Sequence, residues 1–305
     1  MANFTSIEEV TERLSDCGYL LDRSLATTVY LSTLLDKPMF LEGEPGVGKT
    51  ELAKVLAQVL EAPLVRLQCY EGLDANTALY EWNYPRQMLH IRLEEARGVE
   101  REHIGEGLFS EEFLLERPLL QALRVAPPQR AVLLIDEVDR SDEEFEAFLL
   151  EVLSDFQITI PELGTLKASQ PPVVVLTSNR TREIHDALKR RCLYHWIDYP
   201  DINKEIGIVL ARVPGIDKAL AMQVCHFMQW LREQELYKHP GVAETVDWAR
   251  ALLALGIAEL DRETTEATLG CLLKYKGDLE SLQEMDLPTA VRQARDSSNA
   301  RALAG

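Results

Sequence analysis

Short apolar runs alternate with segments of helical periodicity through the first two thirds of the chain. Four runs cover Pro38–Glu42, Leu64–Gln68, Ala131–Ile135 and Pro172–Ser178, and a fifth covers Leu193–Tyr199. Continuous apolar runs separated by helical patterns are typical of parallel strands, which the intervening helices bury on both faces. The pattern therefore predicts an α/β fold with a five-stranded, mainly parallel sheet between layers of helices.

The hydrophobic pattern changes after Pro200, and from there on it predicts helices only. One predicted helix has apolar residues at helical spacing along one face: Leu220, Val224, Phe227 and Leu231. Two more helices are predicted over Ala243–Leu260 and Leu269–Tyr275. At about 150 residues per domain, the chain has room for two domains. We predict an α/β core with N-terminal helices over residues 1–200 and a small all-helical lid domain over residues 201–305.

The charge balance disfavours nucleic acid as a partner. Acidic residues outnumber basic residues by 50 to 32, which gives a formal net charge of −18, and such a surface repels phosphate backbones. No apolar run approaches the ~18 residues of a membrane span, and the N-terminus has no signal-peptide pattern. We therefore expect a cytoplasmic protein that binds no nucleic acid and has no membrane span.

The cysteines and histidines do not indicate a metal centre. The five cysteines are dispersed and form no Cys-x-x-Cys pair, as expected for reduced thiols. None of the six histidines is paired with another at metal-ligand spacing. We predict no metal other than the Mg²⁺ that accompanies a bound nucleotide.

A glycine-rich segment between the first predicted strand and the helix after it matches G-x-x-x-x-G-K-[ST] completely. Its three glycines let the backbone curl so that N–H groups point at a phosphate, and the helix adds its N-terminal dipole. Lys49 would place its charge between the β- and γ-phosphates, and the Thr50 hydroxyl would bind Mg²⁺. The predicted ATP-binding residues are Gly43, Glu44, Pro45, Gly46, Val47, Gly48, Lys49, Thr50 and Glu51.

Two carboxylates follow the apolar run Ala131–Ile135, at the edge where open α/β sheets bind ligands. Asp136 is expected to bind Mg²⁺ mostly through its water shell. Glu137 is the natural base for polarising a water in line with the γ-phosphorus. Because a P-loop kinase needs no such adjacent glutamate, the pair favours hydrolysis over phosphoryl transfer to a small molecule.

Asn179 follows the next strand along the chain, and two interpretations of it are open. An amide beside Asp136 and Glu137 could hydrogen-bond the γ-phosphate and the attacking water. An asparagine after a strand is more commonly a turn residue, but its position here favours the catalytic interpretation. A P-loop GTPase is disfavoured, because no Asn-Lys-x-Asp segment is present to recognise guanine.

Taken together, these motifs resemble those of the AAA+ superfamily in order and spacing, over roughly residues 20–260. They are Gly43–Thr50 (Walker A), Asp136-Glu137 (Walker B), Asn179 and Lys189-Arg190-Arg191-Cys192. The segments Gln68–Gly72 and Phe156–Gly164 resemble the MoxR branch more narrowly. Within that branch, Tyr80–Asn83 and Tyr194–Pro200 are most similar to the CoxD-type members.

The resemblance implies a ring, typically a homo-hexamer, in which an arginine from a neighbouring subunit completes each ATP site. Such an arginine can raise the hydrolysis rate by about 10³–10⁵-fold. Arg191 best matches the family position, and Arg190 is the second candidate. Arg250 is the candidate for the lid arginine that contacts ATP, although it lies at least one turn later than the family pattern. The resemblance also implies an insert over residues 97–113 and a hairpin over residues 156–168, both facing the ring pore or the client.

The function that the resemblance implies is ATP-driven maturation of a client protein, that is, a chaperone-like hydrolase. Its partner would be a protein with a von Willebrand factor A domain. The CoxD-type likeness suggests that the client is a metalloenzyme of the molybdenum dehydrogenase type. The alternative is an ATP-dependent assembly scaffold or binding module, in which hydrolysis only resets the state. The variant Glu137→Gln distinguishes the two, because it should bind ATP without turnover.

Overall fold

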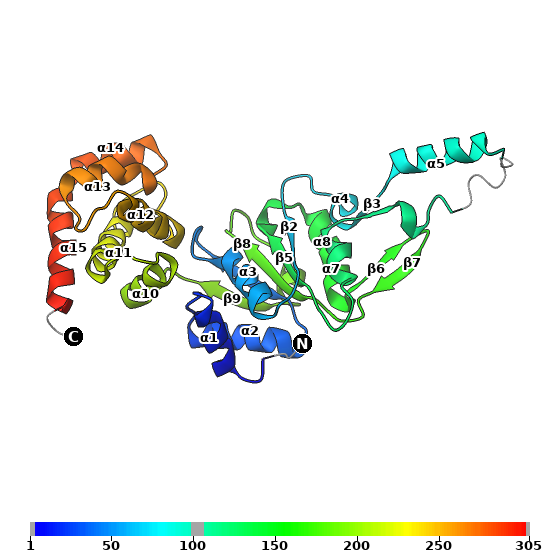
Figure 1. The fold of residues 1–305 in the computed structure, drawn as a ribbon, viewed down its shortest axis with the longest axis horizontal. Helices are drawn as coiled ribbons and strands as arrows, with labels where there is room; N and C mark the ends of the chain where they lie inside the picture. The colour runs from blue at the N-terminus through cyan, green and yellow to red at the C-terminus, as the bar shows by residue number, and fades with distance from the viewer. Residues whose placement is uncertain (1–3, 99–106, 303–305) are drawn as a thin grey trace. The chain divides into compact units, whose positions relative to one another are not determined.

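The computed structural model describes residues 4–98 and 107–302, which form two compact units (Figure 1). The sheet unit contains the chain up to Arg13, Asp22–Glu42 and Thr50–Trp196. The helical unit contains Leu14–Leu21, Gly43–Lys49 and the chain from Ile197 onward. Among the described residues, no helix has the length and apolarity that crossing a membrane requires.

Five strands form the main sheet, in the order β2-β5-β8-β1-β9. They are β1 (Met39–Gly43), β2 (Leu64–Gln68), β5 (Val132–Asp136), β8 (Val173–Ser178) and β9 (Leu193–Ile197). The β2–β5, β5–β8 and β8–β1 pairs are parallel, which confirms the predicted α/β class and its mainly parallel sheet. The register places Gln68 opposite Asp136, so polar residues that end neighbouring strands meet at one edge.

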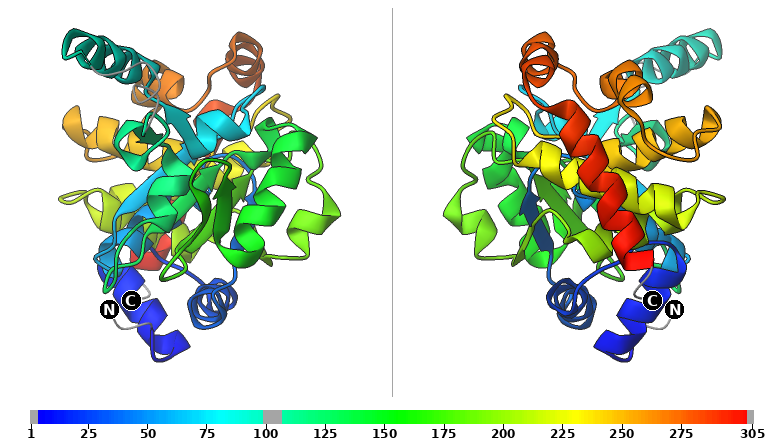
Figure 2. Two further views of the ribbon diagram at one scale, coloured as in Figure 1. Left: turned by 90° about the vertical axis from the view of Figure 1, so that its right-hand side faces the viewer. Right: turned by 90° about the vertical axis from the view of Figure 1, so that its left-hand side faces the viewer.

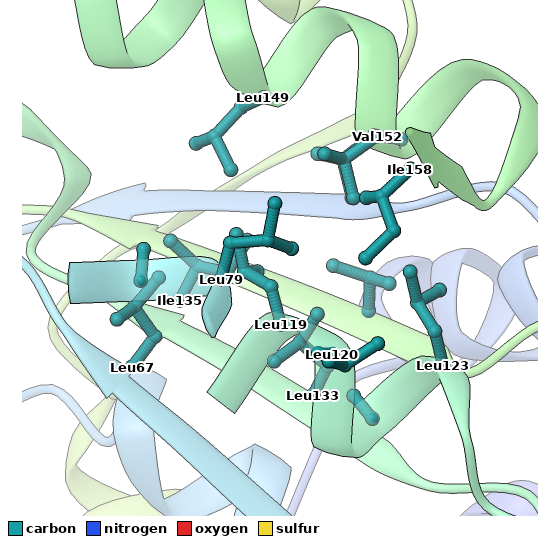
Figure 3. Packing of buried hydrophobic residues seen from close by; sticks show 14 of the residues in the cluster. Leu67, Leu79, Leu119, Leu120, Leu123, Leu133, Ile135, Leu149, Val152 and Ile158 are labelled. Carbon is teal, nitrogen blue, oxygen red and sulfur yellow. The ribbon is translucent and has the colours of Figure 1, made fainter. Parts of the chain in front are cut away.

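Hydrophobic side chains from alternate strand positions pack against two helices, α7 (Pro118–Leu123) and α8 (Glu143–Asp155). The cluster includes Leu67, Leu79, Leu119, Leu120, Leu123, Leu133, Ile135, Leu149, Val152 and Ile158 (Figure 3). Burying each such side chain stabilises the fold by about 1.5–3 kcal/mol. The intervening residues Val132 and Leu134 are also fully buried. Since successive strand residues point to opposite faces, both faces of the sheet are covered.

Aspartates fix the starts of two helices in this unit. Asp22 precedes α2 (Arg23–Leu35) and accepts a hydrogen bond of 2.8 Å from the Leu25 N–H; Asp142 does the same for α8 with the Phe145 N–H. The other helices that the structure describes before residue 197 are α1 (Ile7–Asp16), α3 (Lys49–Val59), α4 (Ala75–Leu79), α5 (Tyr84–Ala96), η1 (Glu111–Phe113), η2 (Val138–Arg140) and α9 (Asp186–Lys189).

Two small antiparallel pairs accompany the main sheet, β3 (Tyr80–Trp82) with β4 (Leu114–Glu116) and β6 (Gln157–Ile160) with β7 (Gly164–Lys167). The second pair confirms the predicted hairpin. Helix α5 follows β3 and extends away from the main sheet (Figure 1). Residues 99–106 of the predicted insert over 97–113 lie outside the described residues, and its described part contains η1 (Glu111–Phe113).

The helical unit is built from six helices and one 3₁₀ turn in the described residues from Ile197 onward. They are α10 (Ile202–Arg212), α11 (Lys218–Arg232), α12 (Val242–Ala254), α13 (Arg262–Thr268), η3 (Leu269–Cys271), α14 (Lys276–Glu284) and α15 (Leu287–Ala302). Helix α15 packs against α11 (Figure 2). The predicted apolar stripe on α11 is confirmed, because all four of its residues are buried.

Two predicted helix boundaries in this unit are wrong, and both errors have a local cause. Helix α12 ends at Ala254 because Gly256, at φ +70°, takes the left-handed conformation that terminates helices. Leu269–Tyr275 forms only a 3₁₀ turn. Its apolar pattern reflects burial in the core of the helical unit, where Leu269, Leu272 and Leu273 pack.

A largely buried ion pair joins α10, α11 and α12, with side-chain exposures of 8% for Arg232 and 0% for Glu205. The Arg232 guanidinium bonds both carboxylate oxygens of Glu205, at 2.9 and 2.7 Å. The Thr245 hydroxyl donates to Glu205 Oε1 at 2.7 Å, and Arg232 Nε donates to the Pro240 carbonyl at 2.9 Å. Such a network satisfies both charges, but removing either partner leaves the other charge buried and uncompensated, which destabilises the fold.

We predict that Arg232→Met lowers the free energy of unfolding by about 3–5 kcal/mol, because Glu205 then stays buried without its counter-charge. Arg262→Gln, which removes an exposed arginine in the same unit, should change it by no more than about 0.5 kcal/mol. Denaturant unfolding followed by tryptophan fluorescence measures both variants. A loss below about 1 kcal/mol for Arg232→Met would show that the pair is not the stabilising element described here.

Candidate functional site

The glycine-rich loop connects β1 directly to α3, as the motif predicts. Gly43 must be glycine, because a Cβ atom there would lie 2.3 Å from the Ile197 carbonyl oxygen. Gly46 has φ +79°, and a Cβ there would lie 3.1 Å from the Glu244 carboxylate and from the Gly241 Cα. The loop conformation thus depends on its glycines for backbone geometry and for space.

Lys49 is the first residue of α3 and is almost fully buried. Its ammonium group donates to two carbonyls of its own loop, that of Gly43 at 2.7 Å and that of Glu44 at 2.8 Å. The loop therefore wraps around a buried positive charge at the start of a helix. Backbone N–H groups, a helix N-terminus and an ammonium group together suit a phosphate.

The N-terminus of α12 contacts the glycine-rich loop within the helical unit. The Ala243 N–H donates to the Gly46 carbonyl at 3.1 Å, and Glu244 Oε2 caps the helix by accepting from the Gly241 N–H at 2.9 Å. Glu244, which the sequence analysis did not select, is therefore the side chain of α12 beside the loop. Its negative charge would repel an anion bound in the loop.

Arg250 lies six residues after Glu244 on the same helix, about 240° further round it at 100° per residue. Its exposed guanidinium bonds Asp247 Oδ1 at 3.4 Å and the Arg212 carbonyl at 3.2 Å. Within the described residues, no hydrogen bond or ion pair joins this side chain to the loop. The role of Arg250 as the lid arginine stays a prediction.

In the sheet unit, Asp136 at the end of β5 is buried, and both of its carboxylate oxygens are bonded. Oδ1 accepts from the Thr50 hydroxyl at 2.9 Å and from the Thr177 hydroxyl at 2.6 Å. Oδ2 accepts from Arg66 Nε at 3.1 Å and Nη2 at 2.5 Å. The two residues predicted to bind Mg²⁺, Thr50 and Asp136, are therefore joined by a direct hydrogen bond between their side chains.

Glu137 has the left-handed backbone conformation, with φ +56° and ψ +50°, which costs a non-glycine residue about 1–3 kcal/mol. A hydrogen bond of 2.9 Å from its N–H to the Thr177 hydroxyl supports that conformation. Its Oε2 is 3.0 Å from Gln68 Nε2 and 3.0 Å from Arg140 Nε. The carboxylate is thus held on one side by an amide and a guanidinium.

Asn179 lies beside Glu137, as the strand order predicts, with its Nδ2 3.5 Å from Glu137 Oε1. Buried Asp139 fixes the loop that carries Asn179. Asp139 Oδ2 accepts from the Asn179 N–H at 3.2 Å, the Thr181 N–H at 2.9 Å and the Thr181 hydroxyl at 2.7 Å. The asparagine is therefore anchored through its backbone, and its amide side chain stays beside the glutamate.

The two candidate arginines, Arg190 and Arg191, follow α9 and differ in what their side chains contact. Arg191 Nη1 donates to the Leu150 carbonyl at 2.9 Å and bonds the Ser154 hydroxyl, both on α8. Arg190 is exposed and has no side-chain hydrogen bond or ion pair within residues 4–98 and 107–302. Arg191 is thus attached to its own subunit, whereas the Arg190 guanidinium is available to another molecule.

The sequence analysis missed three residues that bond Asp136 or Glu137: Arg66, Gln68 and Thr177. Together with Thr50, Asp136 and Glu137 they form what we call the acidic cluster. All three belong to strands that flank β5, and they reach the carboxylates through the parallel register. Alternation along β2 offers a signal, because Arg66 and Gln68 are polar residues two positions apart on one face. Their partners could not be inferred, because sequence alone does not reveal the strand order.

The donor set fits Mg²⁺. The Thr50 hydroxyl donates its proton to Asp136 and keeps its oxygen lone pairs for a cation, while Asp136 supplies a carboxylate for the water shell of the ion. Mg²⁺ prefers such oxygen ligands and retains most of its waters. Thr50 and Asp136 are the residues that would bind it.

Cys69 follows β2 and lies against this cluster. Burial, together with the nearby negative charges of Asp136, Asp139 and Glu137, raises the pKa of its thiol to about 12. The thiol therefore stays protonated at neutral pH and is no candidate nucleophile. All five cysteines are free, as expected for reduced thiols.

Comparison with known proteins assigns the part of the chain that carries these residues. Residues 38–192, just over half of the chain, match the family model described as "AAA domain (dynein-related subfamily)". The matched segment contains the glycine-rich loop, the acidic cluster, Asn179 and both candidate arginines.

Similar proteins include an uncharacterised protein of Staphylococcus epidermidis, 26% identical over 228 residues that cover 72% of this chain and 77% of that protein. An uncharacterised protein of Staphylococcus haemolyticus has the same identity and coverage. Among solved structures, the Thermotoga maritima RuvB Holliday junction branch migration motor is 17% identical, with a TM-score of 0.44, and the match covers 88% of this chain and 72% of that one.

We predict that iodoacetamide alkylates Cys69 at pH 8 at least about 100-fold more slowly in the folded protein than in urea, because almost no thiolate forms. Its pKa is raised on folding, so the stability that Cys69 contributes is complete below pH ~8.5 and is lost as the pH rises toward 12. Mass spectrometry of the alkylated peptide gives the rate. Equal rates in the folded and unfolded chain would refute the burial of the thiol.

Proposed function

Because the chain belongs to the AAA domain family, in its dynein-related subfamily, we propose that it hydrolyses ATP and uses the energy to remodel a client protein. The observation that carries the proposal is the cluster of Thr50, Asp136 and Glu137 at one edge of the sheet. Lys49 and Thr50 are consecutive residues of α3, so a single helix start joins the glycine-rich loop to this cluster.

Each residue then has a defined task. Lys49 exchanges the carbonyls of Gly43 and Glu44 for phosphate oxygens. Thr50 and Asp136 bind Mg²⁺, which neutralises charge on the β- and γ-phosphates. Glu137 accepts a hydrogen bond from the attacking water and polarises it. Asn179, beside Glu137, orients the same water and the γ-phosphate.

A second subunit supplies the last group in this proposal. An arginine that stabilises charge in the transition state from a neighbour must reach beyond its own subunit. Arg190, exposed and without a side-chain partner in the described residues, suits that task better than Arg191, which bonds Leu150 and Ser154 of its own α8. We assign the trans arginine to Arg190 and regard Arg191 as the residue that fixes the segment.

The proposed assembly is a homo-hexameric ring of the MoxR type, most like the CoxD group. It would act with a protein that contains a von Willebrand factor A domain, and its client would be a metalloenzyme of the molybdenum dehydrogenase type. The support is the resemblance of the motifs together with the net charge of −18, which suits a basic or metal-bearing partner face. The partner proposal fails if no such protein stimulates the ATPase or co-purifies with it.

One observation favours the alternative of an ATP-dependent scaffold. Glu137 is bonded to Gln68 and Arg140, and a glutamate held in this way is a poor base until those contacts are broken. A subunit with such a glutamate would retain ATP for long periods and hydrolyse it only to reset the assembly.

We predict that Glu137→Gln binds ATP as tightly as the parent but hydrolyses it about 10²–10⁴-fold more slowly, because the amide cannot accept the proton of the water. Glu151→Gln, the same change on an exposed position of α8, should have the parental rate. Binding is measured with a fluorescent ATP analogue and turnover by phosphate release.

Client maturation by the same variant separates the two functions. If Glu137→Gln supports maturation, the remodelling machine is wrong and the scaffold is right. If the variant hydrolyses ATP at the parental rate, Glu137 is not the base and the proposed site is wrong.

A further inference from the structure

Arg66 of β2 bonds the proposed metal-binding carboxylate directly, yet the proposed ATP hydrolysis gives it no task. Its guanidinium donates twice to Asp136 Oδ2, at 3.1 and 2.5 Å, and its side chain is 50% exposed, against 4% for Asp136. The pair therefore joins a buried carboxylate to a cation that opens to water on its other side.

The two oxygens of Asp136 are engaged by donors of different kinds. Oδ1 accepts two hydroxyl protons, from Thr50 and Thr177, and a cation bound to the lone pairs of Thr50 leaves both bonds intact. Among the residues that the structure describes, Oδ2 accepts only from Arg66, whose positive charge would lie close to a divalent cation on Thr50. Like charges at such separations repel, most strongly where water is excluded. Mg²⁺ and the Arg66 guanidinium must therefore compete for this carboxylate.

Gln68 holds Arg66 in the competing position. Its Oε1 accepts from Arg66 Nη2 at 2.6 Å, while its Nε2 donates to Glu137 Oε2 at 3.0 Å. The amide is thereby oriented, with its oxygen toward Arg66 and its nitrogen toward Glu137. A chain of hydrogen bonds therefore connects the proposed metal-binding carboxylate to the proposed water-activating one. It runs from Asp136 through Arg66 and Gln68 to Glu137.

We propose that Arg66 is a built-in competitor of the divalent cation at Asp136, and that its displacement is transmitted through Gln68 to Glu137. Arg66 is half-exposed, so its released guanidinium returns to water, and the charge of the bound cation then compensates the buried Asp136 carboxylate in its place. Once Arg66 leaves, the Gln68 oxygen loses its donor, and the amide that holds Glu137 can turn. Correct metal loading thus precedes activation of the water. The inference rests on the proposed ATPase function.

The competition predicts a gain of metal affinity, which damage to the site would not produce. The probe is Mn²⁺, titrated into the full-length chain saturated with ADP and followed by electron paramagnetic resonance, with Mn²⁺ and ADP alone as the reference. Arg66→Gln should bind Mn²⁺ about two- to tenfold more tightly than the parent, as expected from loss of a half-exposed charged hydrogen-bond partner. Arg66→Met, which keeps the apolar stem, provides a second neutral variant.

Two control variants separate charge from other effects. Arg66→Lys keeps the positive charge and should bind Mn²⁺ within about twofold of the parent, since the electrostatic competition remains. Arg262→Gln removes an exposed arginine from the helical unit and should leave the affinity unchanged. Circular dichroism melting confirms that each variant is folded.

The inference is overturned if both neutral variants bind Mn²⁺ as the parent does or more weakly, or if Arg66→Lys is as tight as Arg66→Gln. Equilibrium dialysis with labelled ADP keeps this failure distinct from failure of the proposed function. If the parent binds no ADP, the ATPase proposal itself is wrong and this inference falls with it. If ADP binds and the neutral variants show no gain, only the role of Arg66 is wrong.

Discussion

The buried carboxylate of Asp136 is the constraint on which the site depends. A carboxylate at the end of a buried strand is costly unless charge and hydrogen bonds compensate it, and four donors from three chain segments do so here: Thr50, Thr177 and Arg66 with two N–H groups. Thr177 also accepts from the Glu137 N–H. The same contacts that make the buried charge tolerable therefore position the start of α3, the strained backbone of Glu137 and the adjoining strands.

The two ends of this network have different environments. Asp136 is enclosed, whereas Glu137 is partly open to water and is bonded to Gln68, Arg140 and Asn179. The enclosed Asp136 carboxylate suits the proposed metal-binding role. The partly exposed Glu137 carboxylate can exchange its hydrogen-bond partners for a water. Buried Asp139 adds rigidity by fixing the Asn179 loop through backbone contacts. Rigid support around one adaptable carboxylate is the arrangement that a controlled hydrolase needs.

Much of this could be predicted from the sequence, because the relevant signals are local. The fold class, the choice of Thr50 and Asp136 as residues of one site, and the placement of Asn179 beside Glu137 followed from the glycine-rich loop, the five apolar runs and the polar residues that end them. The contacts of Arg66 and Gln68 could not be predicted, since they depend on β2 lying next to β5. The end of α12 could have been predicted from the sequence, because a glycine such as Gly256 commonly terminates a helix. The apolar spacing of Leu269–Tyr275 was misread as helical, since burial in a loop and on a helix can give the same short pattern.

We propose that this chain hydrolyses ATP at a site completed by a neighbouring subunit. Specific ATPase activity measured over about two decades of protein concentration, with Lys49→Ala as the blank, tests it most directly, because assembly is governed by mass action. If a neighbouring subunit completes the site, activity per chain rises steeply as subunits assemble and then reaches a plateau. Added Arg190→Ala subunits should lower that plateau. Activity that exceeds the blank but does not depend on concentration would contradict the proposal, because each chain would then carry a complete site.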